Sequence, residues 1–480
     1  MDSPTIRAFP ELFSKSVEAK IYAVATRDYL SQQQQGPPKY HPEYVEPGGN
    51  GSHPYTFTQS QFWTSGFFPG SIWLLYERAK IYGVTSGIVG LEEWLTLAKT
   101  WTQPIALQAG RDNTHDIGFL FMPTFYKWYN LEKSEEARET LLKAAGGLAS
   151  RYNPFIGCTR SWDASGHLLH GFPKEEKDKH FLVIIDNMMN LDLLYAAHYF
   201  APSAQSPNLE GMATQHAVTT WKNQFRADRG TWHVLDYSQP ASAGTPATVL
   251  KRWAAQGYSD ESTWSRGQAW ALHGYAKCAE WTSILAREAE KEGSGKSNGS
   301  GNLESKDGKF SGRMDFVEHA KAASDYFVKR LGDGKEAVPP WDFDCPRPSD
   351  GSLTFRDVSA GMIAASGMLT LHTLLRQIDP SAPPSPYLSH ALKIIRATLK
   401  YCCTPPARFI PSDQMTPSVD LGEGAWDTIL NQSTINYNEH ARRRWADVGL
   451  VYADYYFLEV GNKLLEMERR GWIAEEEMKV

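Results

Sequence analysis

Residues 186–200 have the sequence DNMMNLDLLYAAHYF, and this stretch decides the fold. Apolar side chains recur at helical spacing behind a polar opening, and too few polar residues follow to cover an exposed face. A helix of this composition is buried on most of its sides. Five other segments share the pattern, so the sequence predicts six buried helices. The six segments are 64–78, 115–129, 186–200, 266–278, 357–374 and 446–465.

Charged, amphipathic stretches separate these segments. They are residues 91–101, 134–151, 212–226, 314–330 and 389–398. Such stretches predict partly exposed helices, each packed on the outside of a buried one. The alternation predicts an all-α fold, an (α/α)6 barrel, in which a double ring of six helical hairpins forms a single domain over residues 1–480.

Two local features modify this pattern. Residues 286–312 are rich in Gly, Ser, Lys and Glu and contain almost no large apolar side chains, which predicts a flexible insertion. Pro123 lies about two turns inside the segment 115–129, where it removes a backbone hydrogen bond. We therefore expect a kink at Pro123.

Composition and motifs exclude several classes of function. The formal net charge is −6 with acids and bases interspersed, so we expect no binding to nucleic acid or to an anionic membrane. The chain shows neither a long apolar run nor a signal-peptide pattern, so we expect a cytoplasmic protein without a membrane span. The 5 cysteines lack CxxC spacing, and HExxH, GxGxxG and GxxxxGK are absent from the sequence. We expect no metal and no nucleotide cofactor.

Two aspartates interrupt strongly apolar surroundings: Asp116 in HDIGF and Asp186 in IIDNMMN. Burial raises the pKa of a carboxyl group because desolvation disfavours its charge, and a raised pKa suits a general acid. Both aspartates open buried helices, and the openings of such helices converge at one end of a ring. The alternative is that each aspartate only caps its helix, which is a common role of Asp. Two of them on adjacent helices favour a shared catalytic site.

Further polar residues lie near the predicted helix openings. Arg266, in TWSRGQAW, is either a bidentate clamp for a substrate carboxylate or the ion-pair partner of one of the two aspartates. Trp270, one turn further on, offers a stacking face. His233 in GTWHVLDY and Gln256 in AAQGYSD lie between elements, where site residues concentrate, although a loop histidine is commonly only solvated.

Aromatic residues make up 12% of the chain. Sugar-binding clefts favour such side chains because a flat apolar face with a polar edge suits a pyranose ring. Trp63 and Trp162 are therefore candidate platforms for sugar rings. The alternative is that they only pack at the rim of the fold.

Four motifs together resemble the unsaturated glucuronyl hydrolases of glycoside hydrolase family 88. The motifs are FWTSGFFPGSIWLLYE, HDIGF, IIDNMMNLDLLYAA and QGYSDESTWSRGQAWALHGYA, and the likeness runs from about Phe62 to Val460. The resemblance implies an (α/α)6 barrel, in agreement with the helix pattern. It also implies a hydrolase that hydrates the C4=C5 double bond of a terminal unsaturated uronic acid, in oligosaccharides made by polysaccharide lyases.

The same resemblance implies roles for individual residues. Asp186 is expected to protonate C4 and then to assist the attack of water at C5, while Asp116 positions the reacting ring. Arg266 and Gln256 are expected to lie nearest the uronate carboxylate. The remaining implied substrate contacts are His115, His233 and Trp270, together with the ring-stacking Trp63 and Trp162.

One departure from the family pattern concerns sulfated substrates. Some relatives that prefer sulfated fragments carry an SxxSxK pattern late in the chain. The equivalent stretch here, Ser433 to Asn438 (STINYN), retains the first serine but lacks the lysine. We therefore expect Ser433 to contact the substrate, and we expect unsulfated disaccharides to be preferred because no cation meets a sulfate there.

Three other functions are compatible with these motifs. The sister family of unsaturated rhamnogalacturonyl hydrolases shares the barrel and the chemistry but acts on a pectin-derived substrate. A conventional inverting glycosidase would cleave saturated glycosides. A non-catalytic sugar-binding barrel would keep the cleft and lose the acid. The tryptophan-rich motif around Arg266 favours the glucuronyl hydrolases, and the presence of both aspartates disfavours a non-catalytic protein.

Overall fold

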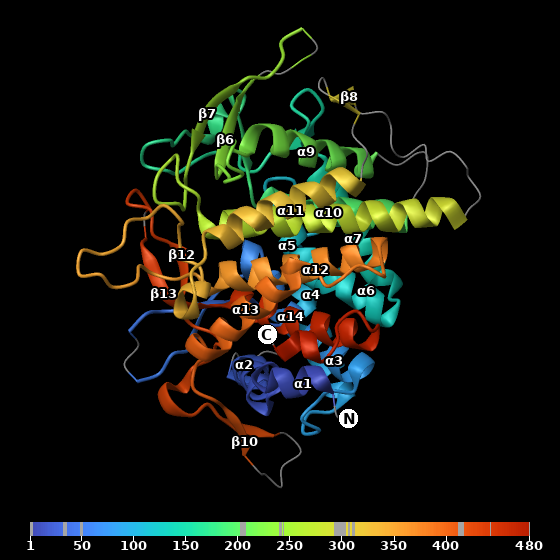
Figure 1. Ribbon diagram of the computed structural model, residues 1–480, viewed down its shortest axis with the longest axis vertical. Coiled ribbons are helices and arrows are strands. Elements are labelled where there is room, and N and C mark those ends of the chain that lie inside the picture. Colours follow the sequence, from blue (N-terminus) through green and yellow to red (C-terminus); the bar gives the residue numbers. More distant parts are fainter. Residues whose placement is uncertain are drawn as a thin grey trace.

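A computed structural model describes most of the chain. The described residues are 3–31, 36–48, 51–201, 208–239, 242, 244–291, 304–305, 308–309, 313–410, 417–441 and 443–479. The structure is mostly helical, as predicted, and long helices stack across its middle (Figure 1).

The six predicted buried helices are present. They are α3 (Phe67–Tyr82), α5 (Ile117–Phe121), α8 (Asn187–Phe200), α10 (Ser265–Lys291), α12 (Val358–Ile378) and α14 (Val451–Arg469). Helix α8 packs between α5 and α10, α12 packs between α10 and α14, and α14 packs on α3. The continuation of α5 contacts α3, so these contacts form a closed cycle.

Six further helices pair with the buried set. They are α2 (Lys15–Ser31), α4 (Leu91–Ala106), α7 (Glu135–Ala149), α9 (Leu209–Gln224), α11 (Arg313–Lys329) and α13 (Pro386–Tyr401). Helix α4 packs on α3, α7 and α9 on α8, α11 on α10, and α13 on α12. The sequence pattern predicted all of these except α2. In α2 the buried positions include Glu18 and Lys20, so polar residues interrupt its apolar face.

Pro123, where the sequence predicts a kink, interrupts the α-helix. Helix α5 ends at Phe121, a π-helical turn η3 (Met122–Tyr126) follows, and α6 (Lys127–Glu132) comes next. Proline has no N–H to donate, and the wider turn accommodates that loss. The hydroxyl of Thr124 donates to the carbonyl of Leu120 at 2.5 Å, which satisfies an acceptor near the break.

Helix α10 extends into the segment predicted to be a flexible insertion. Helix α10 continues to Lys291, so residues 286–291 are helical and that part of the prediction was wrong. Two short strands, β8 (Glu304–Ser305) and β9 (Gly308–Lys309), pair within the segment. The other residues of the predicted insertion lie outside the described part of the chain.

Small antiparallel sheets, which the helix pattern did not predict, join the ends of the helices. One sheet has the order β12-β13-β1-β2 and another the order β5-β6-β7. Residues 445–450 form β13, not the start of the last helix, because Asp447 has φ 58°, which a right-handed helix excludes. The strands of the first sheet are β1 (Tyr40–Val45), β2 (Tyr55–Gln59), β12 (Ser433–Asn436) and β13 (Trp445–Leu450).

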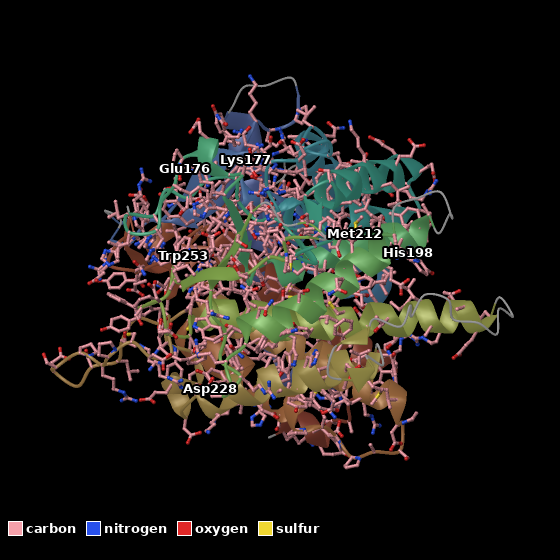
Figure 2. All side chains as sticks on the ribbon, turned by 90° about the horizontal axis from the view of Figure 1, so that it is seen from above. Glu176, Lys177, His198, Met212, Asp228 and Trp253 are labelled. Carbon is pink, nitrogen blue, oxygen red and sulfur yellow. The ribbon has the colours of Figure 1, made fainter. Side chains whose placement is uncertain are left out.

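The second sheet consists of β5 (His180–Ile184), β6 (Val234–Ser238) and β7 (Val249–Trp253). Figure 2 looks onto the face where this sheet lies beside α9, with Trp253 and Met212 towards opposite sides. The short α-helix and strands that remain are α1 (Pro4–Ala8), β3 (Tyr152–Asn153), β4 (Cys158–Thr159), β10 (Arg408–Ile410) and β11 (Ser418–Asp420).

Among the described residues, one helix is long and apolar enough to cross a membrane. This helix is α12, and 89% of its most apolar window is buried inside the protein. A core helix of a folded domain meets the same criteria, and α12 contacts α10, α13 and α14. The length and apolarity of α12 are accounted for by this packing.

Candidate active site

Asp116 and Asp186 lie at the N-terminal ends of the neighbouring helices α5 and α8. Asn190 joins these two ends: its Oδ1 accepts a hydrogen bond from the backbone N–H of Phe119 at 3.1 Å, and its Nδ2 donates to the carbonyl of Asp186 at 3.3 Å. Within the described structure, neither aspartate side chain makes a capping hydrogen bond. Capping therefore does not explain these two carboxylates.

The register of the second sheet places His233 beside Asp186. Ile184 at the end of β5 pairs with Val234 at the start of β6, so the residues that flank this pair are neighbours. The backbone N–H of Ile185 donates to the carbonyl of His233 at 3.0 Å. His233 Nε2 lies 3.8 Å from Asp186 Oδ1, which has no hydrogen-bond partner among the described residues.

Burial determines the protonation of both groups. Burial, opposed by Arg266 and reinforced by the nearby Asp116, raises the pKa of Asp186 to about 7. Burial and Arg266 lower the pKa of His233 to about 3, so its ring is neutral near pH 7. The N–H of Ala255 donates to His233 Nδ1 at 3.2 Å. We therefore assign the ring proton to Nε2, which faces Asp186.

Asp116 is held by its neighbours in the sequence. Thr114 Oγ1 donates to Asp116 Oδ2 at 2.8 Å, and His115 Nε2 lies 3.2 Å from Asp116 Oδ1. His115 is fully buried, and its Nδ1 lies 3.3 Å from the carbonyl of Ser161. Desolvation lowers the pKa of His115. The Asp116 side chain keeps 20% of its surface exposed, so it faces the open side of the site.

Arg266 pairs with neither of the two aspartates. Its Nη1 donates to Asp357 Oδ2 at 2.5 Å and to the carbonyl of Thr434 at 2.6 Å, while its Nη2 donates to the carbonyl of Ile435 at 2.7 Å. The residue is 1% exposed and its Nε is without a hydrogen-bond partner in the described structure. Arg266 thus joins the start of α10 to the start of α12 and to β12, and its Nε–H makes none of these bonds.

The three candidate tryptophans occupy different environments. Trp63 and Trp162 are half-buried, with the Trp63 ring centroid 5.4 Å from that of Phe119 and the Trp162 centroid 6.3 Å from that of His115. Trp270 is fully buried and packs against Phe119 at 5.0 Å. The prediction that Trp270 offers an open stacking face was wrong for this structure, because neighbouring rings cover it.

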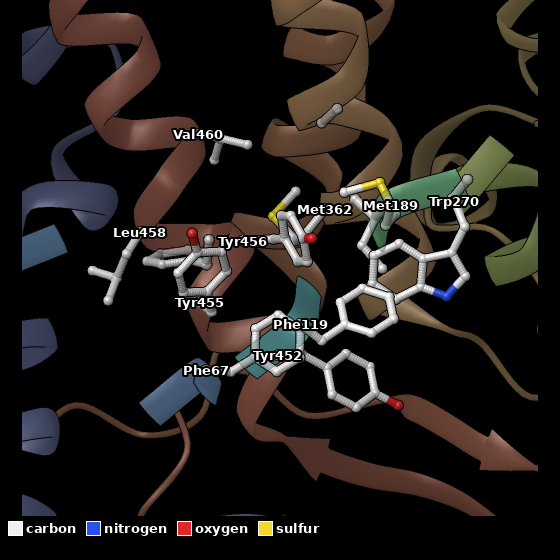
Figure 3. Close-up of a cluster of buried hydrophobic side chains, with 14 of the residues drawn as sticks. Phe67, Phe119, Met189, Trp270, Met362, Tyr452, Tyr455, Tyr456, Leu458 and Val460 are labelled. Atoms are coloured by element: carbon white, nitrogen blue, oxygen red, sulfur yellow. The ribbon is translucent and has the colours of Figure 1, made fainter. Parts of the chain in front are cut away.

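A cluster of aromatic side chains lies between the inner helices, on the inner side of the site. Figure 3 shows Phe67, Phe119, Trp270 and Tyr452 gathered between the inner helices. On the far side of this cluster lies a separate cavity of about 240 Å³, lined by Phe119 and by paired charges such as Asp192 and Lys277. The cluster therefore forms the floor of the site.

Gln256 and Ser433 both lie at β12. Gln256 Nε2 donates to the carbonyl of Ile435 at 3.1 Å, so this side chain is bound to the hairpin. Ser433 is fully buried and its hydroxyl has no hydrogen-bond partner in the part of the chain described. Ser433 therefore lies beneath the surface of the site, a position that its sequence context did not indicate.

Two contributors to the site carried no clear sequence signal. Tyr452 lies inside the last predicted helix, yet its buried ring is 5.4 Å from the guanidinium carbon of Arg266. Asn190 lies one turn inside α8 and connects the two catalytic candidates. Among the described residues, no group of three or more His, Cys, Asp or Glu side chains is arranged to hold a metal ion.

Comparison with known proteins identifies relatives along most of the chain. No protein-family model matches. The chain is 30% identical over 402 residues to the unsaturated glucuronyl hydrolase of Formosa agariphila, covering 83% of this chain and 79% of that protein. It is 26% identical over 405 residues to the unsaturated chondroitin disaccharide hydrolase of Streptococcus pneumoniae, covering 84% and 82%.

Solved structures are similar over almost the whole length. An unsaturated glucuronyl hydrolase specific for heparin matches with a TM-score of 0.68 and 27% identity, covering 96% of this chain and 98% of that one. The unsaturated glucuronyl hydrolase of Bacillus sp. GL1 matches in fold with a TM-score of 0.66 and 23% identity, covering 94% and 96%. Together with the sequence relatives, these matches show that the chain belongs to the unsaturated glucuronyl hydrolases of glycoside hydrolase family 88.

Proposed function

We propose that this enzyme releases the unsaturated uronic acid from the non-reducing end of oligosaccharides that polysaccharide lyases produce. The observation that carries the proposal is the buried carboxyl group of Asp186, which has an unpartnered oxygen and a pKa raised to about 7. Such a group holds its proton near neutral pH until an acceptor arrives. The C4=C5 bond of an unsaturated uronate is an acceptor of this kind.

The reaction begins when Asp186 transfers its proton to C4, which leaves a positive charge shared by C5 and the ring oxygen. Water then adds to C5 and gives a proton back to the Asp186 carboxylate. The resulting hemiketal opens to a ketone at C5, which converts C1 into a hemiacetal. Loss of the remaining sugar from C1 as an alcohol leaves an aldehyde and completes the cleavage.

The other site residues bind and orient the substrate in this proposal. Asp116, on the open side of the site, positions the uronate ring. The unpartnered Nε–H of Arg266 receives the uronate carboxylate, to which a guanidinium is well suited. The half-buried rings of Trp63 and Trp162 stack on sugar faces. His115, His233, Gln256 and Ser433 complete the predicted set, whereas Trp270 supports the site from its buried place beside Phe119.

We further propose that the closed cycle of inner helices and its outer partners constitute an (α/α)6 barrel formed by one domain. The contacts of α8, α10, α12 and α14 with their ring neighbours support this architecture, as does the placement of the outer helices on them. The starts of α5, α8, α10 and α12 contribute Asp116, Asp186, Arg266 and Asp357 to one site. That convergence is expected of parallel inner helices in such a barrel.

Asp186→Asn should abolish most of the activity, because the amide cannot donate a proton to C4. We expect kcat to fall by about 10²–10⁴-fold. The assay follows the loss of ultraviolet absorbance of the conjugated uronate. Asp192→Asn is the matched control: it lies on the same helix and is buried, but it pairs with Lys277 beneath the aromatic floor. Equal activity of Asp186→Asn and the parent would contradict the proposed role.

The pH dependence should follow the protonation of Asp186. Because the acid form reacts, kcat/KM should fall as the pH rises through about 7. The charge of Asp116 raises the pKa of Asp186, so Asp116→Asn should move this basic limb to lower pH, in addition to slowing the reaction. Profiles of kcat/KM against pH measure the shift, with Asp192→Asn as the control. An unmoved limb in Asp116→Asn would show that the two carboxyl groups do not interact.

Arg266→Ala should affect both stability and substrate binding. It leaves the fully buried Asp357 carboxylate without its ion pair, so we expect the free energy of unfolding to fall by about 3–5 kcal/mol. The KM should rise because the uronate carboxylate loses its partner. Thermal denaturation and steady-state kinetics separate the two effects, and the exposed Arg408→Ala serves as control. A parental KM in the Arg266 variant would restrict this residue to a structural role.

The stretch Ser433 to Asn438 supports a preference for unsulfated disaccharides, because it places no lysine at this position. We expect a higher kcat/KM on an unsulfated unsaturated disaccharide than on its sulfated form, measured side by side with the absorbance assay. Preferred turnover of the sulfated form would refute the expected specificity. Preferred turnover of an unsaturated rhamnogalacturonan disaccharide would instead favour the sister family.

A further inference from the structure

Two asparagines of the β12–β13 hairpin are bonded to the loop formed by residues 254–257. Asn438, which is 3% exposed, donates through Nδ2 to the carbonyls of Ala254 at 3.3 Å and Gly257 at 2.6 Å. Asn436 donates through Nδ2 to the carbonyl of Ala255 at 3.1 Å. Three amide-to-carbonyl contacts therefore hold this loop against the hairpin.

The acceptor oxygens of the two asparagines are also occupied. Asn436 Oδ1 accepts from the N–H of Asn438 at 3.0 Å, and Asn438 Oδ1 accepts from the N–H of His440 at 2.8 Å. Each side chain thus bonds both to its own hairpin and to the loop. A shorter side chain, such as that of serine or alanine, does not reach both partners, so the amide groups are matched to this junction.

The loop in turn controls the ring of His233. The N–H of Ala255, which lies between the bonded carbonyls of Ala254 and Ala255, donates to His233 Nδ1 at 3.2 Å. A neutral imidazole that accepts at Nδ1 carries its proton on Nε2. In the described structure His233 Nε2 and Asp186 Oδ1 both lack a hydrogen-bond partner, and they face each other at 3.8 Å. Catalytic hydrogen bonds of this length commonly shorten when substrate binds.

The opposite tautomer would have the opposite effect on Asp186. With the proton on Nδ1, the bare lone pair of Nε2 would face the carboxyl oxygen and would disfavour its ionised form. The charged and titratable groups that face His233 are Arg266, His115 and His167, and those that face Asp186 are Arg266, Asp116 and Tyr452. Neither asparagine is ionisable, so replacing one leaves every one of these groups in place.

We propose that Asn436 and Asn438 are positioning residues, which hold the 254–257 loop so that Ala255 fixes the Nε2–H tautomer of His233 against Asp186. In this arrangement the Nε2–H group stabilises the carboxylate that Asp186 becomes after it protonates the substrate. The effect on catalysis rests on the proposed function of Asp186. The tautomer itself does not depend on that function and is testable without substrate.

The tautomer is measured directly by long-range ¹H–¹⁵N spectra of protein labelled with ¹⁵N-histidine, with His233 assigned from the spectrum of His233→Gln. We expect the Nε2–H form in the parent enzyme at pH 7. The Nδ1–H form in the parent would overturn the proposal, whatever the enzyme turns over. Absence of activity on every unsaturated oligosaccharide would instead overturn the proposed function and leave the tautomer result intact.

The variants Asn438→Ala and Asn436→Ala test the chain of contacts. We expect a mixture of His233 tautomers, a kcat lower by about tenfold to a hundredfold, and a basic limb of the pH profile moved to higher pH. The limb moves upward because loss of the donor raises the pKa of Asp186. Asn436→Ala loses one bond to the loop and is the milder variant should Asn438→Ala fail to fold.

Asn153→Ala is the matched control. Asn153 organises a turn elsewhere by accepting from the N–H groups of Phe155 at 2.9 Å and Ile156 at 3.4 Å. It should lose stability without a change in the His233 tautomer or in the position of the basic limb. If the hairpin variants lower kcat but keep the parental tautomer and the parental limb, the two asparagines are merely structural and the proposal fails.

Discussion

The site depends on the burial of one guanidinium group. Arg266 is 1% exposed, and a charge so buried is costly unless it is paired and hydrogen-bonded. Its partners are Asp357 at the start of α12 and the carbonyls of Thr434 and Ile435 in β12. Two inner helices and a hairpin are therefore brought to one point, and Gln256 joins them by donating to the same carbonyl of Ile435.

The same low-dielectric environment determines the charge state of the candidate site. Burial keeps the imidazole of His233 neutral and holds the proton of Asp186 near pH 7. Arg266 opposes that shift at Asp186 and Asp116 reinforces it, so the pKa of Asp186 results from competing effects. An uncharged acid beside an uncharged imidazole costs little to bury. In the proposed reaction, charge separates only when the substrate accepts the proton, and in the proposed tautomer a neutral Nε2–H donor then faces the new carboxylate.

The sequence predicted those parts of the structure that depend on local pattern. Helical spacing of apolar residues located all six inner helices, and the polar interruptions at Asp116 and Asp186 identified the two carboxyl groups. The strands were missed because they are short. In addition, β13 ends at Leu450 and α14 begins at Val451, so the apolar residues of the strand merge with the helical pattern that follows. The partner of Arg266 was missed because Asp357 lies 91 residues away, and no local rule selects it over Asp116 or Asp186.

Contacts between residues far apart in the sequence make the site dependent on the whole fold. Asn438 contacts Gly257 across 181 residues of sequence, and it can do so only after α10, α12 and the hairpin have packed together. The hairpin runs directly into α14, and α14 packs on α3 near the start of the chain. The contacts that orient His233 therefore depend on the closed ring of helices. Helix α8 alone carries Asp186, but Arg266 and His233, which surround its carboxyl group, come from α10 and from the residue before β6, so the environment of the Asp186 proton is a property of the whole fold.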